Sequence, residues 1–189
     1  MRVIAGLYKG RVLKTVKDLS VRPATDRVKQ TIFDMLTHRL VFDGANVLDL
    51  FAGSGSLGIE ALSRGANRVT FVESNNDAGS FIEKNLETLG CEDSAEVIAM
   101  DAMQYLRRAR EQYDLIFADP PYEYDETATI PSIVFQDKVL KRHGYLLIEH
   151  ASGLQFDDTP LYHAGPSRKF GRTIVTFFVH PQQQEHHHE

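Results

Sequence analysis

The sequence predicts an α/β fold: a mostly parallel seven-stranded sheet with an antiparallel strand at one edge and helices on both faces. Two observations support this prediction. Short apolar runs of strand length alternate with segments whose apolar residues repeat at helical spacing, the pattern of a doubly wound sheet. The chain then ends in a hairpin, because Gly165-Pro166 and Gly171 bracket a short segment before the apolar run 173–179 and leave no room for a helical crossover.

Size and composition limit the chain to one main domain. Its 189 residues, 42% of them hydrophobic, suffice for one α/β domain and little more. The single Cys91 excludes an internal disulfide, and no apolar stretch near the N-terminus is long enough for a signal peptide or a membrane span. We expect a monomeric cytoplasmic protein without a metal ion. Its parts are a basic β-hairpin extension (1–22), the α/β domain (23–181) and a disordered or tag-like tail (182–189).

Charge is unevenly distributed along the chain. The net charge is −5, yet residues 1–40 carry nine Lys or Arg against three acidic residues, and the remainder is strongly acidic. A basic segment on an acidic body is expected of a protein that contacts nucleic-acid phosphates at one end, although a solvated charged terminus would look the same. The candidate contacts are Arg2, Lys9, Arg11, Lys14, Arg22 and Arg27.

The first 40 residues predict a hairpin and a helix. Segments 2–6 and 11–14 flank a glycine-containing loop and are expected to pair as β-strands. Pro23 keeps the residue before it extended, and Thr25 is a candidate N-cap. Apolar residues then repeat at helical spacing, which predicts a helix that runs to about Leu40.

The next segment predicts a nucleoside-cofactor site. The apolar strand 47–51 is followed at once by glycines in a G-x-G-x-x-G pattern, at positions 53, 55 and 58, and by a helix start. Glycines at such a turn let backbone N–H groups and a helix N-terminus approach a ligand closely. The run 68–73 predicts a second strand, whose final carboxylate, Glu73, can accept from ribose hydroxyls.

This pattern does not by itself select the cofactor. A dinucleotide and S-adenosylmethionine both fit it, and a strand-to-helix turn without any ligand is the alternative. The acidic residue ahead of the glycines, Asp49, is more typical of S-adenosylmethionine-dependent methyltransferases than of nicotinamide enzymes.

The later strands are predicted to bring polar residues to the same edge of the sheet. A polar cap at 74–77 opens a helix that ends at Gly90, and the strand 95–99 leads to Asp101, which either accepts from an adenine amino group or caps the next helix. A strand at 113–118, a helix at 128–141 and a strand at 145–149 follow. Ligands bind beyond the carboxyl ends of such strands, where Asp49, Glu73, Asp101 and Asp119 are expected together.

The motif Asp119-Pro-Pro-Tyr122 indicates chemistry on an amine. An exocyclic base amine is a poor nucleophile until its two N–H bonds are held by acceptors, and the Asp119 carboxylate and Pro120 carbonyl could take them. Consecutive prolines, with Pro121 the second, fix the backbone so that the acceptors need no ordering on binding. Tyr122 could stack on a flipped-out base, although a rigid turn with a packed tyrosine is the alternative.

Over nearly its whole length the chain resembles the RsmD family of 16S ribosomal RNA guanine-N2 methyltransferases. The resemblance lies in Arg2-Val-Ile-Ala-Gly6, Tyr8-Lys-Gly-Arg11, Arg22-Pro-Ala-Thr-Asp-Arg-Val28, Leu48-Asp-Leu-Phe-Ala-Gly-Ser-Gly-Ser-Leu-Gly58, Glu60-Ala-Leu-Ser-Arg-Gly65 and Asp119-Pro-Pro-Tyr122. The family pattern also allows Phe in place of Tyr122 and Asn in place of Asp101, so hydrogen bonding by Tyr122 is not implied, and the C-terminal third matches more loosely.

The resemblance implies a Rossmann-like class I fold that binds S-adenosylmethionine. It also implies a guanine amine held at Asp119, Pro120, Pro121 and Tyr122, and a substrate of 16S ribosomal RNA within an assembling small subunit. The implied cofactor contacts are Asp49, Phe51, Ala52, Gly53, Ser54, Gly55, Ser56, Leu57, Glu73, Ser74, Asp101 and Ala102.

Other functions remain open at this point. The amine could belong to adenine in DNA or RNA, or to a glutamine side chain, although such enzymes more often carry Asn where this chain has Asp119. A catalytically silent RNA-binding protein and a nicotinamide oxidoreductase are the alternatives outside methyl transfer.

Overall fold

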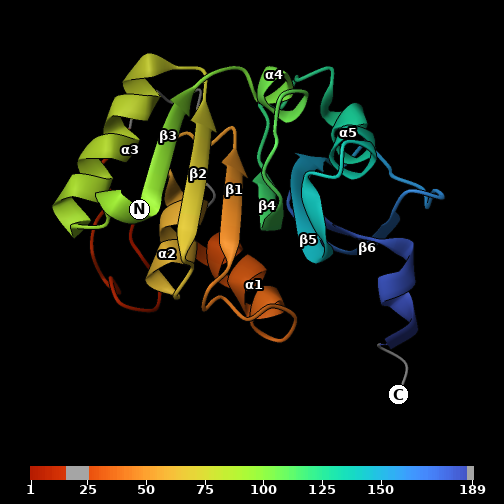
Figure 1. Cartoon of the computed structure of the whole chain (residues 1–189), viewed down its shortest axis with the longest axis horizontal. Coiled ribbons are helices and arrows are strands. Elements are labelled where there is room, and N and C mark those ends of the chain that lie inside the picture. Colours follow the sequence, from red (N-terminus) through yellow and green to blue (C-terminus); the bar gives the residue numbers. More distant parts are fainter. Residues whose placement is uncertain (16–25, 187–189) are drawn as a thin grey trace.

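The computed structural model describes residues 1–15 and 26–186, with side chains up to residue 183. The candidate contact Arg22 and the candidate cap Thr25 lie outside these residues. Within them, seven strands form one sheet in the order β3-β2-β1-β4-β5-β7-β6 (Figure 1). The strands are β1 Asn46–Leu50, β2 Arg68–Glu73, β3 Ala95–Ala99, β4 Tyr113–Ala118, β5 Leu140–Ala151, β6 His163–Phe170 and β7 Thr173–Val179.

The pairing of the strands confirms the predicted fold class. Strands β1 to β5 are parallel, whereas β7 runs antiparallel to both β5 and β6. The antiparallel hairpin thus stands at one edge of the sheet, with β7 next to the parallel strands and β6 outermost. Because β7 is reversed, its first residue lies at the end of the sheet where the parallel strands β1 to β5 finish.

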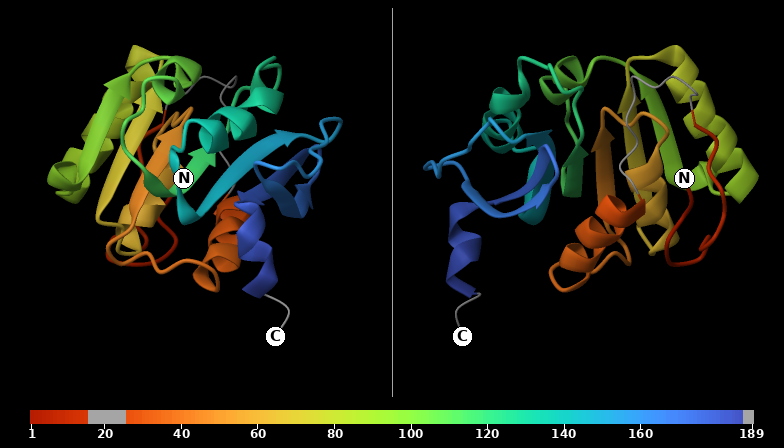
Figure 2. Two further views of the ribbon diagram at one scale, coloured as in Figure 1. Left: turned by 45° about the vertical axis from the view of Figure 1, so that its right-hand side comes forward. Right: turned by 180° about the vertical axis from the view of Figure 1, so that it is seen from behind.

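Helices cover both faces of the sheet (Figure 2). On one face, α1 (Asp26–Thr37), α2 (Ser56–Ser63) and α3 (Asn76–Leu89) share one buried apolar cluster with side chains of the strands. On the other, α4 (Ala102–Leu106) and α5 (Ile130–Gln136) share a second cluster. Successive strand residues alternate between the two clusters, as the period of a strand requires.

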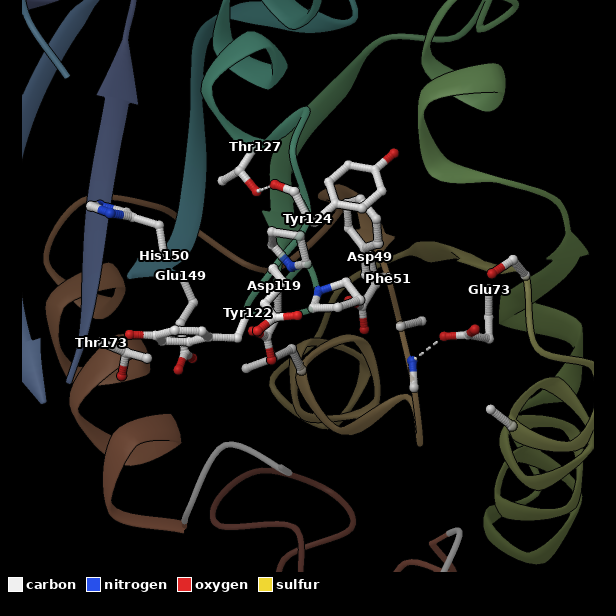
Figure 3. Close-up of a pocket in the computed structure, with 18 of the residues that line it drawn as sticks. Asp49, Phe51, Glu73, Asp119, Tyr122, Tyr124, Thr127, Glu149, His150 and Thr173 are labelled. Carbon is white, nitrogen blue, oxygen red and sulfur yellow. Dashed lines mark hydrogen bonds between the residues drawn. The ribbon is translucent and has the colours of Figure 1, made fainter. Parts of the chain in front are cut away.

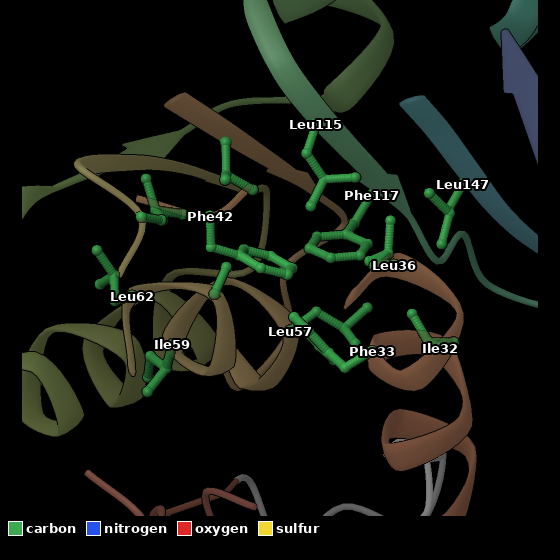
Figure 4. Close-up of a cluster of buried hydrophobic side chains, with 14 of the residues drawn as sticks. Ile32, Phe33, Leu36, Phe42, Leu57, Ile59, Leu62, Leu115, Phe117 and Leu147 are labelled. Atoms are coloured by element: carbon green, nitrogen blue, oxygen red, sulfur yellow. The ribbon is translucent and has the colours of Figure 1, made fainter. Parts of the chain in front are cut away.

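Aromatic packing holds α1 against the sheet. Phe33 is fully buried, and its ring centroid lies 5.6 Å from those of Phe42 and Phe117 (Figure 4). Burial of one such side chain is worth about 1.5–3 kcal/mol. Of the apolar residues that predict this helix, Ile32, Phe33 and Leu36 are buried and Val28 is half-buried, and the helix ends at Thr37, slightly before the predicted end.

The N-terminal segment is fastened to α2 and forms one β-bridge, between Arg2 and Val12, where a longer hairpin was predicted. The reason lies in its partners: the N–H groups of Ile4 and Ala5 donate to the Glu60 carboxylate, at 2.8 and 3.0 Å, and so are not available to an opposite strand. Its apolar residues Val3 and Leu13 are buried in the main core, so the segment is built into the domain.

Glu60 is the centre of a buried charge cluster. It is fully buried in α2, and its carboxylate lies 3.6 Å from Lys29 Nζ and 3.0 Å from Arg64 Nε. Lys29 Nζ also donates to the Arg2 carbonyl at 2.7 Å and to Ser56 Oγ at 3.2 Å. Through these bonds α1, the N-terminal segment and the first residue of α2 are held together.

Two predicted segments differ from the structure. The helix expected at 128–141 ends at Gln136, because Lys138 adopts the left-handed conformation (φ 56°) and Leu140 pairs with Tyr113 as the start of β5. The tail, expected from residue 182 to be disordered or tag-like, begins within a 3₁₀ helix, Pro181–His186, where Arg142 Nη2 donates to Gln182 Oε1 at 2.8 Å.

Across residues 1–15 and 26–186, no helix is both long and apolar enough to span a bilayer.

Candidate active site

The glycine turn after β1 is shaped by its backbone. Gly53 and Gly55 have φ angles of 56° and 75°, which favour glycine. Gly58 is needed for a different reason: a Cβ there would lie 2.3 Å from the Phe71 ring, so only glycine lets α2 pack this closely on β2. The buried Asp49 carboxylate accepts from the Gly58 N–H at 2.9 Å and ties the end of β1 to the first turn of α2.

Glu73 closes the turn from the neighbouring strand. One carboxylate oxygen accepts from the Gly53 N–H at 2.8 Å (Figure 3). The other accepts from the Asn75 N–H, also at 2.8 Å. Each oxygen keeps a second lone pair, so the side chain can also accept from a pair of ribose hydroxyls. A nucleoside cofactor therefore fits this part of the site.

Asp101 acts as a helix cap. Its side chain accepts from the Gln104 N–H at 2.9 Å, which makes it the N-cap of α4. With Ala102 it also lines a small cavity of about 90 Å³, beside the Phe51 and Tyr124 rings, whose centroids are 5.0 Å apart.

The main cavity, of about 670 Å³, is lined by both of the sequence motifs that carry chemistry. The glycine turn and Glu73 form one side, and the Asp119-Pro-Pro-Tyr122 segment another (Figure 3). Of the predicted cofactor contacts, Gly55 lies behind the turn, where it caps α2, and Asp101 and Ala102 line the smaller cavity. The predicted residues on the main cavity are Asp49, Phe51, Ala52, Gly53, Ser54, Ser56, Leu57, Glu73, Ser74, Asp119, Pro120, Pro121 and Tyr122.

The diproline segment leaves β4 as a tight turn. Tyr124 N donates to the Pro121 carbonyl at 2.9 Å, and Pro120 is buried. Tyr122, by contrast, is 64% exposed although it lines the cavity. A large aromatic ring held at a cavity mouth can stack on a flat ligand.

Burial, with a smaller contribution from neighbouring carboxylates, raises the pKa of Asp49 and of Asp119. Burial raises the pKa of Asp49 to about 8, against the hydrogen bond from Gly58, and the nearby Glu73 adds to the rise. Burial also raises the pKa of Asp119 well above its usual range, helped by the charges of Glu149 and Asp49. Such a pocket favours a cationic ligand, which would stabilise the ionised carboxylates.

Sequence reasoning missed several residues of the cavity. Glu149 ends the predicted fifth strand. The rule that ligands bind at the carboxyl ends of parallel strands, which predicted Asp119, therefore predicts Glu149 as well. Thr173 is the first residue of the reversed strand β7, and no local signal indicates which edge of a sheet such a strand starts from. Met1 and His150 also line the cavity.

The predicted RNA contacts are spread over two ends of the molecule. Residues 6–11 turn at the C-terminal end of α2, where Leu7 N donates to the Ser63 carbonyl, and Arg11 Nη2 donates to the Thr88 carbonyl near the end of α3. These helix ends lie where the parallel strands begin, at the end of the sheet opposite the cavity. The exposed Lys9 and Arg11 are there, whereas Lys14 is next to Thr15 of the cavity.

A basic group that was not predicted stands beside the cavity. Arg168, Lys169 and Arg172 are exposed at the tip of the β6–β7 hairpin. The tip leads directly into Thr173 of the cavity. The two other predicted contacts that the structure describes, Arg2 and Arg27, are exposed as well.

Comparison with known proteins identifies the family. The model of the family described as "Conserved hypothetical protein 95" matches residues 1–179. A relative from Haemophilus influenzae named ribosomal RNA small subunit methyltransferase D is 38% identical over 152 residues, which are 79% of this chain and 78% of its own. The chain belongs to the RsmD family.

Solved structures share the fold of this RsmD-family protein. The structure of yhhF from Escherichia coli matches with a TM-score of 0.84 and 28% identity, covering 95% of this chain and 97% of that one. A SAM-dependent methyltransferase from Agrobacterium tumefaciens, at 16% identity and a TM-score of 0.61, covers 86% and 64% of the two chains and shares the fold. The fold is that of class I SAM-dependent methyltransferases, and the cofactor of this RsmD-family protein is S-adenosylmethionine.

Proposed function

We propose that this protein methylates the exocyclic N2 amine of a guanine in 16S ribosomal RNA, within an assembling small ribosomal subunit. The observation that carries the proposal is that one cavity is lined by the glycine turn, Glu73 and the Asp119-Pro-Pro-Tyr122 segment. The name of the Haemophilus influenzae relative supports ribosomal RNA as the substrate. The protein would act as a monomer in the cytoplasm, and light scattering of the purified protein tests the monomer.

The cofactor would lie along the carboxyl ends of β1 to β3. Glu73 would accept from the ribose hydroxyls, and the adenine would lie toward Phe51, Asp101 and Ala102. The acidic groups Asp49 and Asp119 suit the positive charge at the other end. S-adenosylmethionine supplies a methyl group bound to a sulfonium sulfur.

The segment after β4 would activate the amine. The Asp119 carboxylate and the Pro120 carbonyl would accept its two hydrogens and turn its lone pair toward the methyl carbon, while Tyr122 stacks on the base. S-adenosylmethionine would give up its methyl group to the nitrogen and keep the carbon–sulfur bonding pair as a neutral thioether, and the surplus proton of the amine would pass to Asp119 and on to solvent. The raised pKa of Asp119 suits a group that takes up a proton.

RNA would reach the cavity across the tip of the β6–β7 hairpin. Arg168, Lys169 and Arg172 are exposed there and can contact phosphates next to the base in the cavity. Lys9 and Arg11, at the opposite edge, would contact more distant phosphates of a large particle.

The test is transfer of a labelled methyl group from S-adenosylmethionine into small-subunit particles that lack the modification. Naked 16S ribosomal RNA serves as the parallel substrate, and mass spectrometry identifies the product nucleoside. We expect N2-methylguanosine, formed more efficiently on particles. Formation of N6-methyladenosine would favour the adenine alternative, and transfer to a protein glutamine would exclude RNA as the acceptor. No transfer, with RNA still bound, would favour the silent binding protein.

A further inference from the structure

Glu149 and Asp119 lie at the ends of neighbouring strands and both line the cavity. Ala118 at the end of β4 pairs with Ile148 in β5, and the two strands are parallel. Asp119 and Glu149 are the residues that directly follow this pair, on strands about 4.8 Å apart. Both line the main cavity with Tyr122, and the charge of Glu149 contributes to the raised pKa of Asp119. In Figure 3 Glu149 and Tyr122 lie on the side of the cavity away from Glu73.

Guanine and adenine differ at the position that a second carboxylate would face. Guanine presents an N1–H donor beside its N2 amine, so its edge offers adjacent donors. Adenine presents a bare N1 acceptor beside its N6 amine, and a carboxylate facing that lone pair would repel it. An enzyme that works on a flipped-out base reads this edge by hydrogen bonds. Two carboxylates from neighbouring strands match the guanine edge and oppose the adenine edge.

We propose that Glu149 accepts the N1–H of the target guanine and thereby selects guanine over adenine. The assignment rests on the proposed function. Asp119 and the Pro120 carbonyl hold the amine that reacts, and Glu149 holds the ring beside it. Unpaired acceptors in a desolvated site make the wrong base costly, which is how a site built for hydrogen bonding discriminates strongly. Glu149 is therefore a substrate-contacting residue with a role separate from that of Asp119.

The experiment removes each partner of this hydrogen bond in turn. Small-subunit particles are reconstituted with 16S ribosomal RNA that carries guanine, 2-aminopurine or adenine at the methylated position. 2-Aminopurine keeps the 2-amine but lacks the N1–H. Single-turnover transfer is measured for the wild-type protein, Glu149→Ala and Glu149→Gln. Asp137→Asn, which removes an exposed carboxylate at the C-terminal end of α5, is the matched control.

We expect Glu149→Ala to lower transfer to guanine roughly 10- to 100-fold, the range for loss of a charged hydrogen bond. On 2-aminopurine the same variant should transfer at least as fast as wild type, because the N1–H is already absent and the repulsion between the Glu149 carboxylate and the bare N1 is removed. Glu149→Gln can donate to adenine N1, so its ratio of adenine to guanine transfer should rise. Asp137→Asn should resemble wild type on all three bases.

Several outcomes would overturn the assignment. The assignment is wrong if Glu149→Ala methylates guanine as fast as wild type. It is also wrong if the variant loses transfer equally on guanine and on 2-aminopurine. Calorimetry with S-adenosylmethionine provides the fold control: a parallel loss of cofactor affinity would assign Glu149 to the cofactor. If wild-type protein modifies no guanine at all, the proposed function and this assignment are both wrong. If wild type modifies guanine and the Glu149 variants do so equally well, only this assignment is wrong.

Discussion

The Glu73 carboxylate and the Gly53 N–H are joined by a hydrogen bond of 2.8 Å, across 20 residues of sequence. This bond links the end of β2 to the turn after β1, so the proposed acceptor for the ribose and the backbone of the proposed cofactor site are fixed in position without a ligand. Gly53 has a positive φ, and the bond from Glu73 stabilises that conformation. The turn is thus preorganised by a residue of the neighbouring strand.

Replacing Glu73 tests this arrangement. Glu73→Ala removes two charge-assisted hydrogen bonds to the backbone, with Gly53 and Asn75, and the proposed acceptors for the ribose. We expect the affinity for S-adenosylmethionine, measured by calorimetry, to fall roughly 10- to 100-fold. Glu83→Ala, which removes an exposed carboxylate of α3, is the control and should bind normally. Unchanged affinity in Glu73→Ala would contradict the assigned role.

Asp119 is predicted to act far more on the amine than on the cofactor. Asp119→Ala should abolish methyl transfer to within detection, because the reacting nitrogen loses an acceptor that directs its lone pair. Affinity for S-adenosylmethionine should change by less than about fivefold, since Glu73 and the glycine turn are intact. Loss of transfer and of binding in equal measure would mean that Asp119 belongs to the cofactor site.

The acidic cavity predicts that cofactor binding depends on pH. In the cofactor-free protein the pKa of Asp49 is about 8, and that of Asp119 is also raised, so protons are held there that an unfolded chain loses near pH 4. The raised pKa values therefore contribute to the free energy of unfolding at low pH, and this contribution is lost as pH rises toward 8. The sulfonium charge favours the ionised carboxylates, so affinity should rise with pH, by up to about tenfold per unit for each proton released.

A product analogue provides the control for this pH dependence. S-adenosylhomocysteine has a neutral sulfur, so its affinity should rise less steeply with pH than that of S-adenosylmethionine. Calorimetry in buffers of different ionisation enthalpy counts the protons released, and Asp49→Asn should release fewer. The facing carboxylates Glu73, Asp119 and Glu149 are kept in this comparison. Identical slopes for the two ligands would mean that the sulfonium charge does not act on these groups.

The buried cluster around Glu60 predicts a large effect on stability. Glu60→Ala leaves Lys29 and Arg64 without their carboxylate and removes the acceptor for Ile4 and Ala5. Breaking a buried ion pair from one side costs about 3–5 kcal/mol in the free energy of unfolding. Urea denaturation measures it, with Glu87→Ala on the exposed face of α3 as the control. A loss below about 1 kcal/mol would show that the cluster is not a structural anchor.

The sequence predicted the sheet well because its strands are locally distinct. The runs at β1, β2 and β4 are short, apolar and followed by turn residues, so their ends could be placed to within a residue. The start of β5 was mistaken for helix because Asp137 to His143 are largely polar and have no strand pattern. Their conformation depends on pairing between Leu140 and Tyr113, a contact that no local pattern encodes.

The site was predictable as far as one topological rule extends. Residues at the carboxyl ends of parallel strands meet at one edge, which gave Asp49, Glu73 and Asp119. Thr173 begins an antiparallel strand, so this rule does not predict it. Net charge likewise indicated a basic N-terminal segment but not where it lies. The bonds from Leu7 N to the Ser63 carbonyl and from Arg11 Nη2 to the Thr88 carbonyl show that its tip is at the end of the sheet opposite the cavity.

Two basic groups at opposite edges allow the path of the RNA to be tested. In one variant Arg168, Lys169 and Arg172 become Ala; in the other Lys9 and Arg11 become Ala. Each lost phosphate contact should lower the slope of log affinity against log salt by about 0.7–0.9. Both variants should bind particles more weakly, but the hairpin variant should also lose transfer at saturating particle concentration, because it positions the base near Thr173. Unchanged salt slopes would exclude the altered group from the RNA interface.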